Sequence, residues 1–281
     1  MGAYKPGYPA GQGTFSGHPE RERFRIDMAA AVGGEWQFLC LPAVDDTTTW
    51  TDLSRNSTTI TLGHSFQLFE TNPAGKGFGM DIQVDGTRNE TATIADANAY
   101  SFGDASTDHP FSVVMLINPS AADIAGGATL FSKWAAGLTA YREWKVGITS
   151  SGYPQMSIHD ESVSSASQVV EYRTPLTAGT WTFLAFSYDG RGGNSASPNG
   201  FNIYKDGVGV SLTANNGGGT YVAMENSTAE VHIGPDLNSN GAPANIYAGR
   251  WGFIGLIPKD LHADEASTMR GLVNNYFTET F

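Results

Sequence analysis

Short stretches in which apolar and polar residues alternate follow one another along most of the chain. A period of two is typical of β-strands that bury one face. Glycine, proline, asparagine and aspartate, which favour turns, separate these stretches. The pattern predicts strands at residues 59–62, 80–84, 111–119, 128–134, 141–148, 154–160, 181–190, 201–210, 229–234 and 251–257.

One of these strands is apolar on both of its faces. Residues 181–188 alternate Trp181 and Phe183 with Leu184 and Phe186. A strand with no polar face is typical of the centre of a sheet that is covered on each side. We therefore expect this strand to lie between two layers of the fold.

Strands at this density, without helices between them, indicate an all-β sandwich or barrel. One helix is expected near the C-terminus, at residues 264–276. Acidic residues occupy its first turn, and apolar residues follow at helical spacing, at Met269, Leu272 and Val273. No repeat of fixed period is present, which argues against a solenoid or propeller.

The first 30 or so residues have a different pattern, because glycine and proline recur every few positions. We expect an extended arm without regular secondary structure, which is either a disordered terminus or a segment that becomes ordered on a partner protein. We assign residues 1–43 to this arm and a connector, and residues 44–281 to a jelly-roll domain that folds without residues 1–30. The arm has six candidate partner-binding side chains: Tyr4, Tyr8, Phe15, Arg21, Arg23 and Arg25.

Composition and charge narrow the class of protein. The 281 residues include 28 acidic and 16 basic side chains, a net charge of −12, which argues against a protein that coats nucleic acid. No apolar run is long enough for a membrane helix. Cys40 is the only cysteine, so no internal disulfide is expected. Residues 1–24 lack the apolar centre of a signal peptide, so we expect export, if any, in a virus particle or by a dedicated secretion system.

The order of several motifs resembles the concanavalin A-like jelly roll of the laminin-G/pentraxin type. The matching pieces cover about residues 45–281: WTDLSRNS, MDIQVDGT, SFGDASTDHPFSVVMLINP, LFSKW, YREWKVGI, GTWTFLAFSYDG, FNIYKDGVGV, VHIGPDLN and WGFIGLIPKDLHADEASTMRGL. The resemblance implies two antiparallel sheets packed face to face. It also implies binding of glycans or proteins, often at a loop edge with a calcium ion. The piece SFGDASTDHPFSVV is similar to modules of tailed-phage structural proteins.

The loop at residues 236–241 is a candidate calcium site. Asp236, Asn238 and Asn240 precede a glycine, and this string matches the first half of an EF-hand loop, in which alternate oxygen ligands surround the ion. The twelfth position is Tyr247 rather than glutamate, so another strand would have to supply the last ligand. The alternative is a hairpin loop rich in asparagine that binds no metal.

Aromatic side chains near strand ends are candidates for stacking on sugars, because sugar C–H faces pack on rings. We select Tyr221, Tyr247 and Trp251 as candidate glycan-binding residues. Catalysis has no comparable signal. The paired carboxylates of a retaining glycosidase and the Gly-x-Ser-x-Gly motif of a serine hydrolase are both missing. We therefore predict no catalytic residue and no enzyme.

The sequence favours a non-catalytic structural or binding protein. We interpret it as a bacteriophage virion component, a capsid decoration, cement or tail-associated subunit that is attached through its arm. Its partners would be other virion proteins and host-surface glycans, with no nucleic acid or membrane partner, and we expect a homo-oligomer in the virion or outside the cell. The alternative is a glycan-binding adhesion module of a cellular surface protein.

Overall fold

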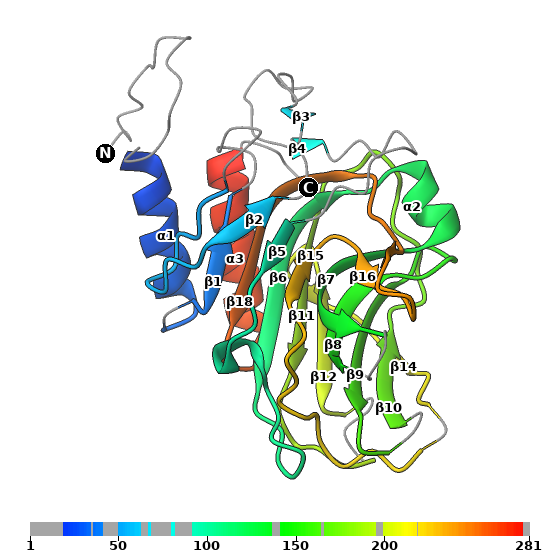
Figure 1. Ribbon diagram of the computed structural model, residues 1–281. Coiled ribbons are helices and arrows are strands. Elements are labelled where there is room, and N and C mark those ends of the chain that lie inside the picture. The colour runs from blue at the N-terminus through cyan, green and yellow to red at the C-terminus, as the bar shows by residue number, and fades with distance from the viewer. Residues whose placement is uncertain are drawn as a thin grey trace.

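The computed structural model describes residues 19–34, 36–41, 50–62, 67–68, 80–81, 92–136, 141–163, 166–194, 199–217 and 219–277. Within these residues the chain forms two β-sheets that face each other, with two long helices on the outside of one sheet (Figure 1). Neighbouring strands are antiparallel apart from one short parallel contact. The predicted all-β, two-sheet antiparallel sandwich is confirmed.

The eight-stranded sheet has β6 and β18 at its centre. Its order is β13-β12-β11-β6-β18-β4-β3, and β1 also pairs with β18. The strands are β1 (Phe38–Cys40), β3 (Gln67–Leu68), β4 (Met80–Asp81), β6 (Phe111–Asn118), β11 (Thr182–Tyr188), β12 (Phe201–Lys205), β13 (Val208–Gly209) and β18 (Arg250–Ile257).

The ten-stranded sheet has the order β14-β10-β9-β8-β7-β15-β5-β2, with the short hairpin β16–β17 beside β7. A short helix, α2 (Ala121–Gly126), leads into β7, and a 3₁₀ turn at Asn98–Tyr100 follows β5. The strands are β2 (Ile60–Leu62), β5 (Ala92–Ile94), β7 (Ala128–Ala135), β8 (Tyr141–Ile148), β9 (Pro154–Asp160), β10 (Ala166–Glu171), β14 (Thr213–Ala214), β15 (Val231–Ile233), β16 (Asp236–Leu237) and β17 (Pro243–Ala244).

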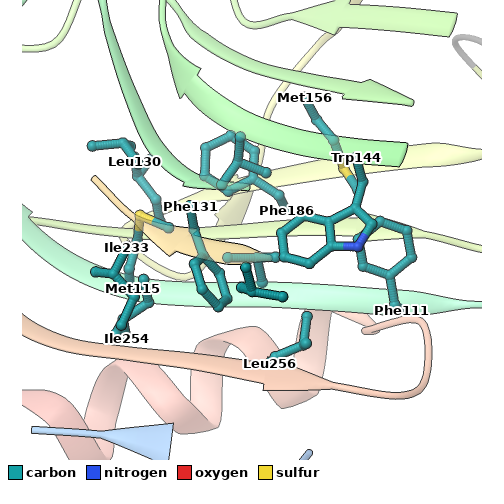
Figure 2. Close-up of a cluster of buried hydrophobic side chains, with 14 of the residues drawn as sticks. Phe111, Met115, Leu130, Phe131, Trp144, Met156, Phe186, Ile233, Ile254 and Leu256 are labelled. Carbon is teal, nitrogen blue, oxygen red and sulfur yellow. The ribbon is translucent and has the colours of Figure 1, made fainter. Parts of the chain in front are cut away.

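The main core fills the space between the two sheets. Figure 2 shows Trp144 of β8 among side chains from both sheets, with its ring centroid 5.6 Å from that of Phe111 and 5.2 Å from that of Phe131. Phe102 stacks on Phe111 at 4.3 Å. Removing this much aromatic and aliphatic surface from water is the main contribution that holds the sheets together.

A second core lies on the other face of the eight-stranded sheet, beneath α1 (Pro19–Ala31) and α3 (Ala263–Phe277). On β11, Phe183 and Ala185 contribute to this second core, whereas Leu184 and Phe186 contribute to the main core. The strand is therefore covered on both faces, as predicted. The predicted C-terminal helix is confirmed by α3.

The predicted extended arm is wrong for residues 19–31, which form α1. Phe24, Met28 and Val32 recur every four residues and are buried, so one side of the helix faces the second core. Proline is tolerated in the first turn of a helix, and α1 begins at Pro19. Glycine and proline before residue 19 obscured this apolar spacing in the sequence.

Contacts of α1 and β1 join both elements to the domain. Phe24 packs against Tyr276 of α3, with ring centroids 5.0 Å apart, and the Tyr276 hydroxyl donates to Asp27 at 2.8 Å. In β1, Cys40 is the register partner of Ile254 in β18. This packing conflicts with the expectation that the domain is independent of residues 1–30. None of the helices in the described ranges has the length and apolarity to cross a membrane.

Candidate ligand-binding site

A pocket of about 280 Å³ opens on the outer face of the ten-stranded sheet. On β8, Trp144 and Val146 belong to the main core, so the alternating residues Lys145 and Gly147 face away from it. The end of α2, the starts of β7 and β9, the end of β8 and the segment after β17 form the walls. The lining residues are Gly126, Gly127, Ala128, Thr129, Lys145, Gly147, Ile148, Thr149, Ser150, Gln155 and Asn245.

Two glycines keep the floor of the pocket free of side chains. A Cβ atom on Gly147 would lie 2.5 Å from the carbonyl oxygen of Ala128. Gly127 has a φ of 80°, in the left-handed region that favours glycine, and a Cβ there would lie 3.0 Å from the carbonyl oxygen of Ile148. Larger residues at either position would require the backbone to move, so the floor consists of backbone atoms.

Asp236 holds two of the lining side chains in place. Its Oδ2 accepts a hydrogen bond from Lys145 Nζ at 3.0 Å, and its Oδ1 accepts one from Asn245 Nδ2 at 2.9 Å. The backbone carbonyl of Asn245 accepts from the backbone N–H of Thr129 at 2.7 Å. These contacts fix the segment after β17 against β7. In Figure 1 this segment, with β16, lies beside β7 on the right of the molecule.

The position of Lys145 is also set by an aromatic ring. Its ammonium lies 4.4 Å from the centroid of the Trp134 ring, a cation–π contact. The His159 ring meets Trp134 edge to face at 5.6 Å. Burial, followed by the positive charge of Arg142, lowers the pKa of His159 to about 4. His159 is therefore neutral near pH 7, and the positive charges beside the Trp134 ring are those of Lys145 and Arg142.

Gln155, on β9, is held from the side of β10. Its Nε2 donates to Glu171 Oε1 at 3.0 Å. The same oxygen accepts from Asn215 Nδ2 at 3.2 Å, and Glu171 Oε2 pairs with Arg173 at 3.3 Å. Because the amide hydrogen bond fixes one end of its side chain, the carbonyl Oε1 of Gln155 is oriented before a ligand arrives.

The lining groups suit the binding of a small polar ligand. They combine one ammonium, two amides and several hydroxyls, so they both donate and accept hydrogen bonds. Among the residues that the structure describes, the pocket lining contains no carboxylate, histidine or cysteine side chain.

The three predicted glycan-binding aromatic residues are buried, so the prediction that they form a sugar platform is wrong. Tyr221 is 1% exposed, and Tyr247 and Trp251 are 0% exposed. Tyr247 and Trp251 pack edge to face at 4.8 Å. The Tyr221 hydroxyl donates to Asp108 Oδ2 at 2.6 Å. Spacing along the chain places such rings near strand ends, but it does not distinguish a ring that faces the core from one that faces solvent.

The candidate calcium ligands make other contacts. Asp236 pairs with the Lys145 ammonium, which repels a cation, and Asn238 Oδ1 accepts from the backbone N–H groups of Asn240 and Ala242 at 2.8 and 3.1 Å. No cluster of three or more His, Cys, Asp or Glu side chains suited to a metal occurs in the described ranges. These residues do not fit a calcium ion, and their contacts are those of the alternative, an asparagine-rich hairpin loop.

The candidate partner-binding residues are only partly within the described ranges. Tyr4, Tyr8 and Phe15 lie outside them, and Arg21 belongs to α1. Two further residues of the set have described side chains. Arg23 is 77% exposed and pairs with Asp27 at 3.6 Å, whereas Arg25 is half-buried.

The pocket residues Lys145, Gln155 and Asn245 were not among the candidate site residues predicted from the sequence. A signal was present in β8, where Lys145 and Gly147 alternate with apolar residues and thereby mark a face without large apolar side chains. The segment that closes the pocket follows β8 by nearly a hundred residues, so no local pattern joins them.

No protein-family model and no curated protein matches this chain. Solved structures do match. The binding domain of Paraclostridial Mosquitocidal Protein 1 has a TM-score of 0.60 and 10% identity, over 87% of this chain and 55% of that chain. The ligand-binding domain of botulinum neurotoxin serotype D, in complex with N-acetylneuraminic acid, has a TM-score of 0.54 and 13% identity, over 87% and 52%.

A bacterial enzyme contains a further similar domain. Domain 4 of AbnA, an extracellular arabinanase from Geobacillus stearothermophilus, in complex with arabinotriose, has a TM-score of 0.53 and 14% identity, over 84% of this chain and 98% of that chain. The chain spans about half the length of the toxin binding domains. At these identities the similarity shows the fold alone, a two-sheet β-sandwich.

Proposed function

We propose that this chain is a non-catalytic saccharide-binding module that binds its ligand in the pocket on the outer face of the ten-stranded sheet. The convergence of Lys145, Gln155 and Asn245 over a backbone floor is the observation on which this proposal rests. Sugar hydroxyls donate and accept hydrogen bonds, and amide side chains do the same. The volume of about 280 Å³ lies close to the lower bound of roughly 300 Å³ for drug-sized ligands, which suits one sugar ring of a longer chain.

Two similar structures support a role in saccharide binding. The serotype D toxin domain is in complex with N-acetylneuraminic acid, and the arabinanase domain is in complex with arabinotriose. Both share a sandwich fold with this chain at 14% identity or less, so the ligand class is a proposal for this chain. The proposal agrees with the sequence-based alternative of a glycan-binding adhesion module that acts outside the cell.

A matched pair of variants in one turn tests the pocket. A glycan array identifies a saccharide that binds, and isothermal titration calorimetry then measures its affinity. Ser150 lines the pocket and is exposed, so Ser150→Tyr should obstruct the opening and weaken binding at least tenfold. Ser151 is also exposed but does not line the pocket, so Ser151→Tyr should bind as the parent does. An array without any bound saccharide, or equal affinities of both variants, would contradict the proposal.

A second proposed function is attachment to a phage particle as a virion component. Arg23 and Ile26 of α1, whose side chain and residue are 77% and 50% exposed, would be available to such a partner. Other virion proteins would be the partners, and the module would be displayed as a homo-oligomer. Co-sedimentation of the protein with intact particles would support this role, and its complete separation from them would contradict it.

A further inference from the structure

Among the described residues, a single charged side chain lines the pocket, and its charge is positive. Lys145 is the cation, and all other lining residues are apolar, glycine or neutral polar residues. The whole chain has a net charge of −12. A pocket with a cation and no lining carboxylate therefore differs from the average surface of this protein, and it favours a ligand of the opposite sign.

The ammonium of Lys145 has donors left for a ligand. It has three N–H groups, and the hydrogen bond to Asp236 at 3.0 Å uses one of them. The Trp134 ring holds the ammonium through its π face and takes no N–H group in a conventional hydrogen bond. The Lys145 side chain is 25% exposed, whereas that of Asp236 is 5% exposed and does not line the pocket. The Lys145 side chain is therefore more accessible from the pocket than its counter-charge.

The donors and acceptors of the pocket point to the same ligand chemistry. Lys145 donates only, and no lining carboxylate is present to accept from sugar hydroxyls. A ligand that supplies its own carboxylate would form a charge-assisted hydrogen bond with Lys145 Nζ. Such bonds are roughly twice as strong as those between neutral groups. A neutral sugar of the same shape lacks this contact.

We propose that the pocket selects a sugar unit that bears a carboxylate, a hexuronate or a sialate, and that Lys145 Nζ binds that carboxylate. This inference rests on the proposed function, because it names the ligand class of the same pocket. Asp236 is a positioning residue in this arrangement, since it holds both Lys145 and Asn245 without lining the pocket.

The test compares acids with their own methyl esters, which have the same ring but no charge. Methyl glycosides of glucuronic, galacturonic and N-acetylneuraminic acid are titrated into the full chain by calorimetry, each beside its methyl ester and a neutral hexose. At least one acid should bind about tenfold more tightly than its ester. Lys145→Met should reduce that ratio to about one, and Lys145→Arg should retain most of it. The control is Lys205→Met, which removes a lysine of similar exposure that pairs with Asp206 outside the pocket.

Salt dependence provides a second measurement that needs no variant. Binding of the acid by the parent protein should weaken between 50 and 500 mM NaCl, as expected for an ion pair, while binding of the ester should change little. Equal affinity for acid and ester in the parent protein would overturn this inference and leave saccharide binding intact. Failure of every acid, ester and neutral sugar to bind would overturn the inference and the proposed function together.

Discussion

Replacing Tyr221 by phenylalanine removes one buried hydrogen bond and keeps the ring. The Tyr221 hydroxyl donates to Asp108 Oδ2 at 2.6 Å, and the Tyr188 hydroxyl donates to the same oxygen at 2.6 Å. The backbone N–H of Met224 donates to Asp108 Oδ1 at 2.8 Å. Burial raises the pKa of Asp108, and these hydrogen bonds oppose the rise. The buried carboxylate therefore depends on protein donors in place of water.

The expected fall in the free energy of unfolding follows from the number of hydrogen-bond donors to Asp108. A hydrogen bond to a charged group contributes roughly 1.5–3 kcal/mol. Two donors remain on Asp108 after Tyr221→Phe, and the phenyl ring fills the same volume, so no cavity adds to the loss. We expect the free energy of unfolding to fall by about 2 kcal/mol at pH 7. For a chain of this size the corresponding fall in Tm is about 4 °C.

Urea unfolding followed by tryptophan fluorescence measures this change. The matched control is Tyr153→Phe, because Tyr153 is half-buried and its hydroxyl makes no hydrogen bond to the described residues. The control should stay within about 0.5 kcal/mol of the parent protein. A loss below about 0.5 kcal/mol for Tyr221→Phe would refute the assigned role of this hydroxyl.

Three further predictions concern α1, the 236–241 loop and a buried histidine. Phe24→Ala should lower the free energy of unfolding by about 3–5 kcal/mol, because it opens a cavity between α1, α3 and the sheet. The control, Ile26→Ala, is at an exposed position of the same helix and should change the free energy of unfolding by less than about 0.5 kcal/mol. Equal changes for both variants in urea unfolding would contradict the packing of α1. A chelator should leave the Tm unchanged, since Asp236 pairs with Lys145; a lower Tm would restore the calcium prediction. Burial lowers the pKa of His159 from 6.5 to about 4, so its contribution to stability is complete above pH 6.5 and is lost as the pH falls toward 4. That contribution is up to about 3 kcal/mol. Between pH 6.5 and 4, the free energy of unfolding of His159→Gln should therefore fall by less than that of the parent protein. An equal fall in both proteins would contradict the lowered pKa of His159.

The sandwich could be predicted because burial in this fold follows the period of the strands. The prediction for 111–119 became β6 (Phe111–Asn118), and that for 251–257 became β18 (Arg250–Ile257). Both strands are apolar on both faces, since each separates the main core from the second core. Short apolar runs bounded by turn residues, rather than a period of two, therefore marked these central strands in the sequence.

The remaining features depend on contacts that no local pattern contains. Helix α1 was obscured by the glycines and prolines that precede it, although Phe24 and Met28 have helical spacing. The pocket requires α2, three strands and Asn245 to meet, and they come together only through the sheet order. The hydroxyl of the buried Tyr221 donates to Asp108, more than a hundred residues before it. Spacing alone could not predict such long-range partners.

The most direct test of the account is to locate bound saccharide by amide chemical shifts. A ¹⁵N-labelled sample of the full chain is titrated with the tightest-binding saccharide from the array, and the perturbed backbone amides are assigned. We predict that the largest shifts fall at residues 126–129, 145, 147–150, 155 and 245, which line the pocket. Shifts confined to the loops around residues 103–108 and 221–227, with the pocket amides unchanged, would contradict the claim that this pocket is the binding site.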